Sequence, residues 1–231
     1  MAIYDNVRRI RDELSETCLR VGRDPDEISL MAVSKFHEAP LIEEAAAAGI
    51  RLFGESRVQE ALRKFTTFRQ TRPGMELHLI GGLQRNKARA AAGFFDCIET
   101  LDRLELVREL GRACGGRAAS PLPVLFELNV GEESKSGFTD EDALCAGVEA
   151  ALGFEGLLPC GLMTMAPFTG DEKPIRAAFG KLVKAQARLR RTFPDRAWDC
   201  LSMGMSGDFK IAIEEGSTLL RIGTAIFGDR R

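Results

Sequence analysis

Apolar residues near the start of the chain follow a helical spacing. Over residues 2–21 they recur every three to four positions, at Ile3, Val7, Ile10, Leu14, Cys18 and Val21. This spacing puts them on one face and predicts an amphipathic helix. Gly22 and the polar turn at Asp24 and Pro25 end that helix.

Beyond it, short apolar runs alternate with longer amphipathic or alanine-rich stretches. The apolar runs predict eight strands, at Ser29–Ser34, Arg51–Gly54, Glu76–Gly81, Cys97–Leu101, Leu122–Val130, Leu157–Met165, Ala197–Met203 and Leu219–Phe227. The stretches between them predict helices at Leu41–Ala48, Arg57–Phe68, Gln84–Ala92, Asp102–Cys114, Asp140–Leu152, Pro174–Thr192 and Asp208–Glu215.

Several predicted strands are apolar nearly throughout, which is typical of strands covered on both faces of a parallel sheet. Parallel neighbours need crossovers, and a predicted helix follows every strand but the last. We therefore expect an α/β fold: a single (β/α)8 TIM-type barrel with an extra N-terminal helix, formed as one domain by residues 1–231. An open, doubly wound sheet of eight strands is the structural alternative.

Composition narrows the functional classes. Apolar residues make up 45% of the chain and charged residues 29%, which excludes a wholly disordered chain. The 32 basic and 34 acidic side chains give a net charge of -2, so nucleic acid is not an expected partner. The N-terminal residues lack a signal peptide's apolar stretch, and no run is long enough to span a membrane. We expect a cytoplasmic protein without a membrane partner.

The residues that usually bind metals are sparse. The six cysteines form no C-x-x-C pair, and the two histidines, His37 and His78, lie in no H-E-x-x-H arrangement. We expect reduced thiols and no metal site.

The carboxyl ends of barrel strands usually carry the functional site. Lys35 ends the first apolar run, and a lysine facing an enclosed pocket there would have a lowered pKa and could form a Schiff base with an aldehyde. The alternative is a lysine that ends the strand and reaches solvent.

Small residues follow the last two predicted strands. The segment 202–206 and the pair Gly223-Thr224 offer backbone N–H groups and hydroxyls to an anion, in the place where barrels often bind phosphate. The alternative is that these glycines only form tight turns.

Arg221 lies inside the last apolar run and needs a partner there. One interpretation is an ion pair with a core carboxylate such as Glu127. The other is that Arg221 faces an acceptor on a ligand, for example a pyridine nitrogen, which it would keep unprotonated. A lysine, a phosphate site and such an arginine together fit pyridoxal 5'-phosphate. A Schiff-base aldolase acting on a sugar phosphate fits less well.

The order and content of several segments resemble one known family. These segments are residues 31–35, 52–60, 78–87, 161–165, 201–206 and 216–228. They resemble the pyridoxal phosphate homeostasis protein family, whose members are similar to the N-terminal domain of alanine racemase. The resemblance runs in order over nearly the whole chain.

The resemblance implies roles for particular residues. Lys35 would hold pyridoxal phosphate as a Schiff base, and Arg221 would face the pyridine nitrogen. The residues that would line the phosphate site or border the cofactor are Ser202, Gly204, Gly223, Thr224, Met163 and Met203. At Ser56, also expected near the cofactor, the family usually has asparagine, so a hydrogen bond there would be lost or water-mediated.

The family resemblance favours a cofactor carrier over an enzyme. Racemisation needs an acid–base group on each face of the bound amino acid. The chain's only tyrosine is Tyr4, in the N-terminal helix, and His37 is interpreted as a loop residue at the pocket rim. We expect a monomeric carrier in vitamin B6 homeostasis that passes pyridoxal phosphate to apo-enzymes. The alternatives are a racemase-like enzyme of amino acids and the Schiff-base aldolase.

Overall fold

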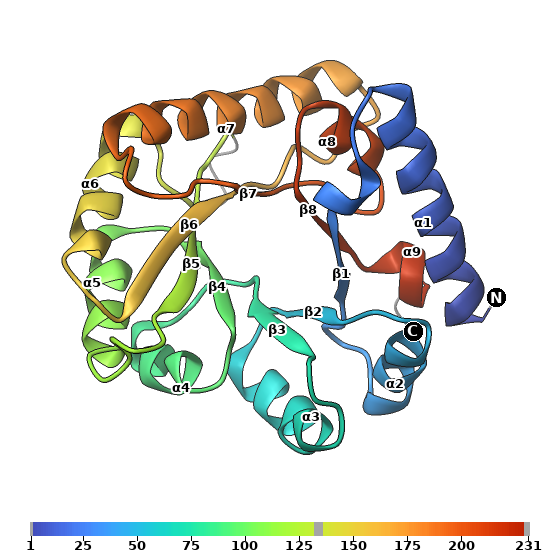
Figure 1. Ribbon diagram of the computed structural model, residues 1–231, viewed down its shortest axis with the longest axis horizontal. Helices are drawn as coiled ribbons and strands as arrows, with labels where there is room; N and C mark the ends of the chain where they lie inside the picture. The colour runs from blue at the N-terminus through green and yellow to red at the C-terminus, as the bar shows by residue number, and fades with distance from the viewer. Residues whose placement is uncertain (1, 132–135, 229–231) are drawn as a thin grey trace.

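The computed structural model describes residues 2–131 and 136–228, which form a closed ring of eight parallel strands surrounded by helices (Figure 1). In barrel order the strands are β1 (Ser29–Val33), β2 (Leu52–Glu55), β3 (Glu76–Leu79), β4 (Cys97–Leu101), β5 (Leu122–Glu127), β6 (Leu157–Met163), β7 (Cys200–Ser202) and β8 (Leu219–Ile222). The ring closes where β1 pairs with β8, with Met31 opposite Arg221. The predicted barrel is therefore confirmed, and the open sheet is wrong.

From β1 onward, a helix lies between each strand and the next. The helices are α1 (Ile3–Arg20), α2 (Ala39–Ala47), α3 (Val58–Thr71), α4 (Ala88–Ala92), α5 (Leu104–Ala113), α6 (Glu141–Leu152), α7 (Glu172–Thr192), α8 (Phe209–Glu214) and α9 (Thr224–Phe227). Two short 3-10 turns, Pro25–Glu27 and Arg85–Lys87, precede β1 and α4. The extra N-terminal helix is confirmed: α1 packs beside α2, α8 and α9 (Figure 1).

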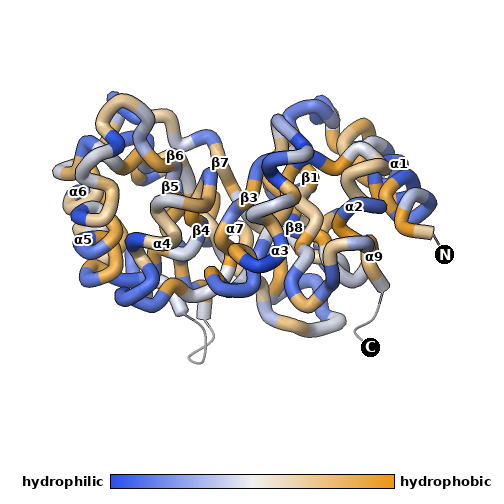
Figure 2. The backbone as a smooth tube through the Cα atoms, turned by 90° about the horizontal axis from the view of Figure 1, so that it is seen from below, coloured by the Kyte–Doolittle hydropathy of each residue, from blue (hydrophilic) through white to orange (hydrophobic). Residues whose placement is uncertain are grey.

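The core lies mainly between the strands and the helices. The apolar face of α1 is buried as its spacing predicts, with Val7 and Ile10 each 1% exposed. In Figure 2 apolar stretches on the strands and helices alternate with hydrophilic loops and outer faces. Burying such faces from water is the main favourable contribution to folding.

Six of the eight strands are shorter than the sequence pattern predicts, β7 and β8 by the most. The run expected as one strand over 219–227 breaks at Gly223, because Ile226 and Phe227 turn their N–H groups back to its carbonyl and form α9. Asn6 Nδ2 in α1 donates to Ile226 O at 2.8 Å, which fixes α9 against α1. Before β7, Trp198 leaves the predicted strand and is fully buried, with its indole N–H donating to Phe193 O at 3.1 Å.

Gly204 permits the turn that leaves β7. Its φ is +98°, and an added Cβ would lie 2.5 Å from Ala212 Cβ. We expect Gly204→Ala to lower the free energy of unfolding by about 1–3 kcal/mol, because strain and overpacking add. Gly207→Ala, in the same loop with nothing within 4 Å of its added Cβ, is the control. Urea unfolding of the two variants measures the difference, and equal midpoints would contradict the expectation.

Candidate functional site

A cavity of about 360 Å³ lies at the carboxyl ends of the strands. This volume falls in the range of small-molecule sites, about 300–1,000 Å³. The residues that line the cavity are Val33, Lys35, His37, Ile80, Met165, Pro167, Phe168, Thr169, Ile175, Met205, Ser206, Gly207, Asp208, Arg221, Gly223 and Thr224. It brings together an amine, a guanidinium and several small residues.

The segment that carries Lys35 is held by a lysine of α3. Lys64, whose side chain is only 2% exposed, donates from Nζ to Ser34 O at 2.8 Å and to His37 O at 3.1 Å. The two carbonyls flank Lys35, so the buried ammonium fixes the segment on both sides. The periodicity of α3 gives no sign of this role.

Two carboxylates balance the Lys64 charge. Lys64 Nζ lies 2.7 Å from Glu55 Oε1 and 2.8 Å from Glu60 Oε1. Glu60 also accepts from the N–H of Phe36 at 2.7 Å, which supports a backbone with φ +68° at that residue. Burial raises the pKa of Glu55, while the pKa of Glu60 is lowered: burial opposes the lowering, but hydrogen bonds from Lys64 and Phe36 outweigh it.

Arg221 lies in β8 and is 4% exposed. Its guanidinium donates from Nη1 to Ser202 Oγ at 2.6 Å and from Nη2 to Thr164 O at 2.8 Å. Ser202 Oγ in turn donates to Glu99 Oε2 at 2.5 Å. Burial lowers the pKa of Arg221, and the charge of Glu99 acts in the opposite direction. Glu99 is therefore linked to Arg221 through a serine.

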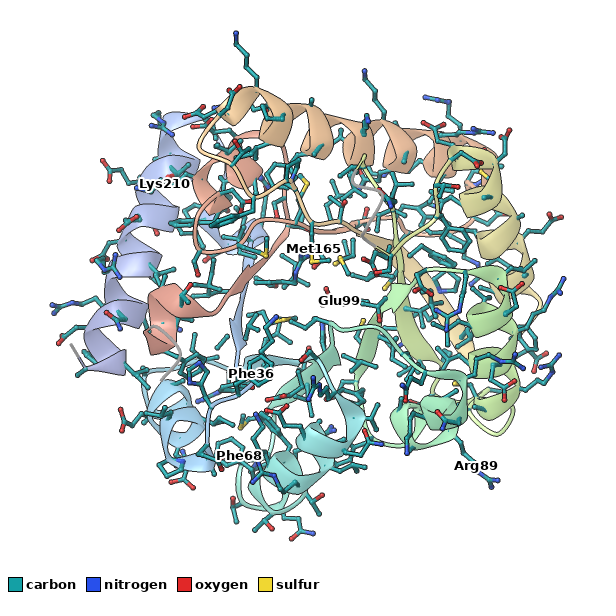
Figure 3. The ribbon with its side chains drawn as sticks, turned by 180° about the vertical axis from the view of Figure 1, so that it is seen from behind. Phe36, Phe68, Arg89, Glu99, Met165 and Lys210 are labelled. Atoms are coloured by element: carbon teal, nitrogen blue, oxygen red, sulfur yellow. The ribbon has the colours of Figure 1, made fainter. Side chains whose placement is uncertain are left out.

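Glu99 also binds His78. Nδ1 of His78 lies 2.7 Å from Glu99 Oε1, and its Nε2 lies 3.9 Å from Glu76 Oε2. Burial favours the neutral ring, yet the nearby Glu76 carboxylate and the hydrogen-bonded Glu99 raise the pKa of His78 to about 9. Burial likewise opposes ionisation of Glu99, but His78, Arg221 and Ser202 lower its pKa. Figure 3 shows Glu99 pointing into the ring, whereas Arg89 points out to solvent.

The loops after β7 and β8 meet at one wall of the cavity. Ala225 N donates to Ser206 Oγ at 3.2 Å, which ties the two loops together. A Cβ added at Gly223 would have only atoms of Val33 near it, the closest at 3.6 Å. Ser206, Gly223 and Thr224 thus form a small-residue surface able to approach an anion closely.

The structure brings four of the predicted site residues to the cavity: Lys35, Arg221, Gly223 and Thr224. Five others lie elsewhere among the described residues. Ser202 bonds Glu99 and Arg221 in the barrel interior, and Met163 packs there beside Leu125.

The remaining three also lie outside the lining of the cavity. Met203 packs in the outer core, and Gly204 forms the turn beside Ala212. Ser56 lies near Gly81 and lines a different hollow. Their roles toward a ligand stay predictions.

Sequence reasoning missed Met165, which lines the cavity, whereas Ser206, which also lines it, belongs to the segment 202–206 predicted to approach an anion. In Figure 3 Met165 lies near the middle of the ring. Met165 lies two positions after Met163, the last residue of β6, and Ser206 lies four positions after Ser202, the last residue of β7. His37, interpreted as a rim residue, lines the cavity and stacks on Phe227 with ring centroids 4.7 Å apart.

Across residues 2–131 and 136–228, no group of histidine, cysteine or acidic side chains is arranged to hold a metal ion. None of the helices in these ranges combines the length and the apolar character that crossing a bilayer requires.

Comparison with known proteins gives a consistent result. The family model "Alanine racemase, N-terminal domain" matches residues 2–231. The pyridoxal phosphate homeostasis protein of Escherichia coli K12 is 41% identical over 233 residues, covering 99% of this chain and 97% of that protein. That of Vibrio cholerae serotype O1 is 39% identical, with coverages of 99% and 97%.

Solved structures show the same barrel. PipY of Synechococcus elongatus PCC7942, solved with PLP bound, is 35% identical with a TM-score of 0.82, covering 95% of this chain and all of that one. Alanine racemase from Bacillus anthracis is 18% identical with a TM-score of 0.76, covering 99% of this chain and 56% of that one. The second likeness concerns the fold alone.

Proposed function

The chain belongs to the family of pyridoxal phosphate homeostasis proteins, built on the alanine racemase N-terminal domain, and we propose that it binds pyridoxal 5'-phosphate and passes it on. The observation that carries the proposal is that Lys35, Arg221 and the Gly223-Thr224 turn line one cavity. We propose that residues 1–231 act as a single binding domain, in the cytoplasm and as a monomer.

The residues of the cavity fit this cofactor. An aldehyde requires an amine, which Lys35 supplies, and a phosphate requires closely approaching donors, which Ser206, Gly223 and Thr224 supply. Arg221 carries a permanent charge that its partners hold in place, and it would face the pyridine nitrogen. Two facing cations repel, so this arginine would keep the ring nitrogen unprotonated.

When bound, the cofactor supplies an electrophilic aldehyde and a ring that can accept electrons. Lys35 would hold the cofactor reversibly through this aldehyde, as a Schiff base formed with loss of water. The backbone around Lys35 is fixed by Lys64 and Glu60, so the amine is presented from a rigid segment. Arg221 weakens the ring as an electron sink, which favours storage over turnover.

We expect the purified protein with added pyridoxal phosphate to be yellow and, after borohydride reduction, to carry a phosphopyridoxyl group on Lys35. Lys35→Ala is expected to abolish that adduct. Lys87→Ala, near the barrel mouth and absent from the cavity wall, is the matched control and keeps it. The measurement is the visible spectrum followed by peptide mapping. A wild-type protein that stays colourless and unlabelled would overturn the proposal and leave sugar-phosphate aldehydes to be tested.

A racemase-like enzyme is the second candidate, because Lys35 and His37 both line the cavity. Tyr4 is 61% exposed on α1 and is not among the lining residues. We propose that the protein has no robust turnover of its own. Loaded protein incubated with amino acids in D2O should exchange the Cα hydrogen no faster than free cofactor does. Rapid exchange that His37→Gln abolishes would favour the enzyme.

Passing the cofactor on requires an acceptor, and we propose that apo-enzymes requiring pyridoxal phosphate are the acceptors. Loaded protein mixed with such an apo-enzyme should restore its activity while losing its own colour. Activity restored no faster than by an equal concentration of free cofactor would argue against direct transfer.

A further inference from the structure

A row of polar side chains crosses the barrel interior and ends at the arginine of the cavity. It runs from His78 in β3 through Glu99 in β4 and Ser202 in β7 to Arg221 in β8. The three links measure 2.7 Å, 2.5 Å and 2.6 Å. We call these four residues the axial chain.

The axial chain is almost dry. Glu99 and Ser202 are fully buried, Arg221 is 4% exposed and the side chain of His78 is 12% exposed. In a low-dielectric interior, neighbouring hydrogen bonds strengthen one another and an unmade bond is costly. A change at one member therefore acts on the others.

The direction of each bond depends on Glu99. A carboxylate only accepts, so ionised Glu99 takes the Ser202 hydroxyl proton on one oxygen and the His78 N–H on the other. A hydroxyl has one proton, so that of Ser202 points away from Arg221 and leaves its lone pairs for Nη1. The second anchor, Thr164 O, then fixes the plane of the guanidinium.

We propose that His78 and Glu99 are positioning residues for Arg221, which orient its guanidinium, through Ser202, toward the ring of the ligand in the cavity. The inference rests on the proposed function, because it takes Arg221 to face that ring.

Other ionisable groups surround the axial chain. The carboxylates near Arg221 are Glu127 in β5 and Asp208 after β7, and Glu76 meets His78 from the outer end of β3. The thiols of Cys97, Cys160 and Cys200 have pKa values raised mainly by burial, that of Cys160 to about 11. These thiols stay neutral at pH 9. We therefore assign a change of charge at the axial chain near that pH to His78, and not to the thiols.

Three variants test the proposal. Glu99→Gln introduces an amide that can donate, and Ser202→Ala removes the link with the loss of one oxygen atom. Glu43→Gln is the control, because it makes the same change at an exposed carboxylate of α2 that takes no part in the axial chain. Each is loaded with pyridoxal phosphate, and affinity, the pH dependence of the visible spectrum and the borohydride adduct on Lys35 are measured.

We expect Glu99→Gln and Ser202→Ala to weaken binding by at least about tenfold, as for loss of a hydrogen bond to a charged group. Both should also shift the pH midpoint of the visible spectrum, which a merely structural role would leave in place. Glu43→Gln should do neither. If the two variants fold, carry the adduct and match Glu43→Gln, the inference is overturned while the proposed function stands. Absence of the adduct in the wild type overturns both.

A measurement on the unsubstituted protein covers the case in which the variants do not fold. With only two histidines, His37 and His78, both imidazoles can be assigned in a 15N-resolved NMR spectrum. Loading the anionic cofactor should raise the midpoint of the His78 titration, as negative charge at the Arg221 end favours the protonated ring. Identical His78 titrations with and without the cofactor would overturn the inference.

Discussion

Replacing Lys64 by methionine is expected to lower the free energy of unfolding by about 3–5 kcal/mol. The substitution leaves Glu55, which is fully buried, without its cation, and an uncompensated buried charge is among the costliest single changes. Glu55 Oε2 already lacks a hydrogen-bond partner among the described residues, so the carboxylate would keep the neutral hydroxyl of Ser34, 2.7 Å from Oε1, in place of a cation. The Ser34 and His37 carbonyls also lose the bonds that Lys64 donates.

Urea unfolding at neutral pH measures this effect, with Lys184→Met on the exposed face of α7 as the control. That control should stay within about 0.5 kcal/mol of the wild type. Adding Glu55→Gln to Lys64→Met should restore part of the loss, because the unpaired charge is then gone. If Lys64→Met and Lys184→Met had equal free energies of unfolding, the cluster of Lys64, Glu55 and Glu60 would not hold the Lys35 segment.

The stability difference between the wild type and His78→Gln is expected to depend strongly on pH. The pKa of His78 is raised to about 9 in the folded protein, above an unfolded value of about 6.5. Its contribution is therefore fully present below about pH 6.5 and is lost as the pH rises through about 9. A pKa raised by this much contributes about 3 kcal/mol to the free energy of unfolding.

Free energies of unfolding at pH 6, 7.5 and 9.5 measure the effect. The gap between the two proteins should narrow by about 3 kcal/mol from the lowest pH to the highest. Groups that titrate alike in both proteins cancel in this comparison. A gap that stays constant would mean that the pKa of His78 is the same in the folded and the unfolded protein.

The barrel was predictable because its signal is local and repeated. Each strand is a short apolar run and each crossover an amphipathic stretch, so the order of elements follows from periodicity. The error at 224–227 arose where periodicity is silent: Gly223 lets the backbone turn, and α1, which lies far away in sequence, stabilises the turn.

The candidate site was predictable only in part. Lys35 and Arg221 stand out because a charged residue ends or interrupts an apolar strand. Side chains alternate along a strand, so Ser202 faces into the barrel while its neighbour Met203 packs in the outer core, and the role predicted for Met203 toward a ligand stays a prediction. The partners of Lys64 and Glu99 come from other elements, and no local pattern says which charges meet.

The pairing of β1 with β8 has a consequence during synthesis of the protein. The cavity needs Lys35, near one end of the chain, together with Arg221 and Thr224, near the other. A ribosome releases β1 long before β8 exists, so the first strand waits for its neighbour and the ring closes last. A partly made chain can offer an aldehyde the Lys35 amine but no arginine and no turn after β8. Tight capture of the ligand therefore begins only after β8 has been made, and a coloured protein reports a barrel that has closed.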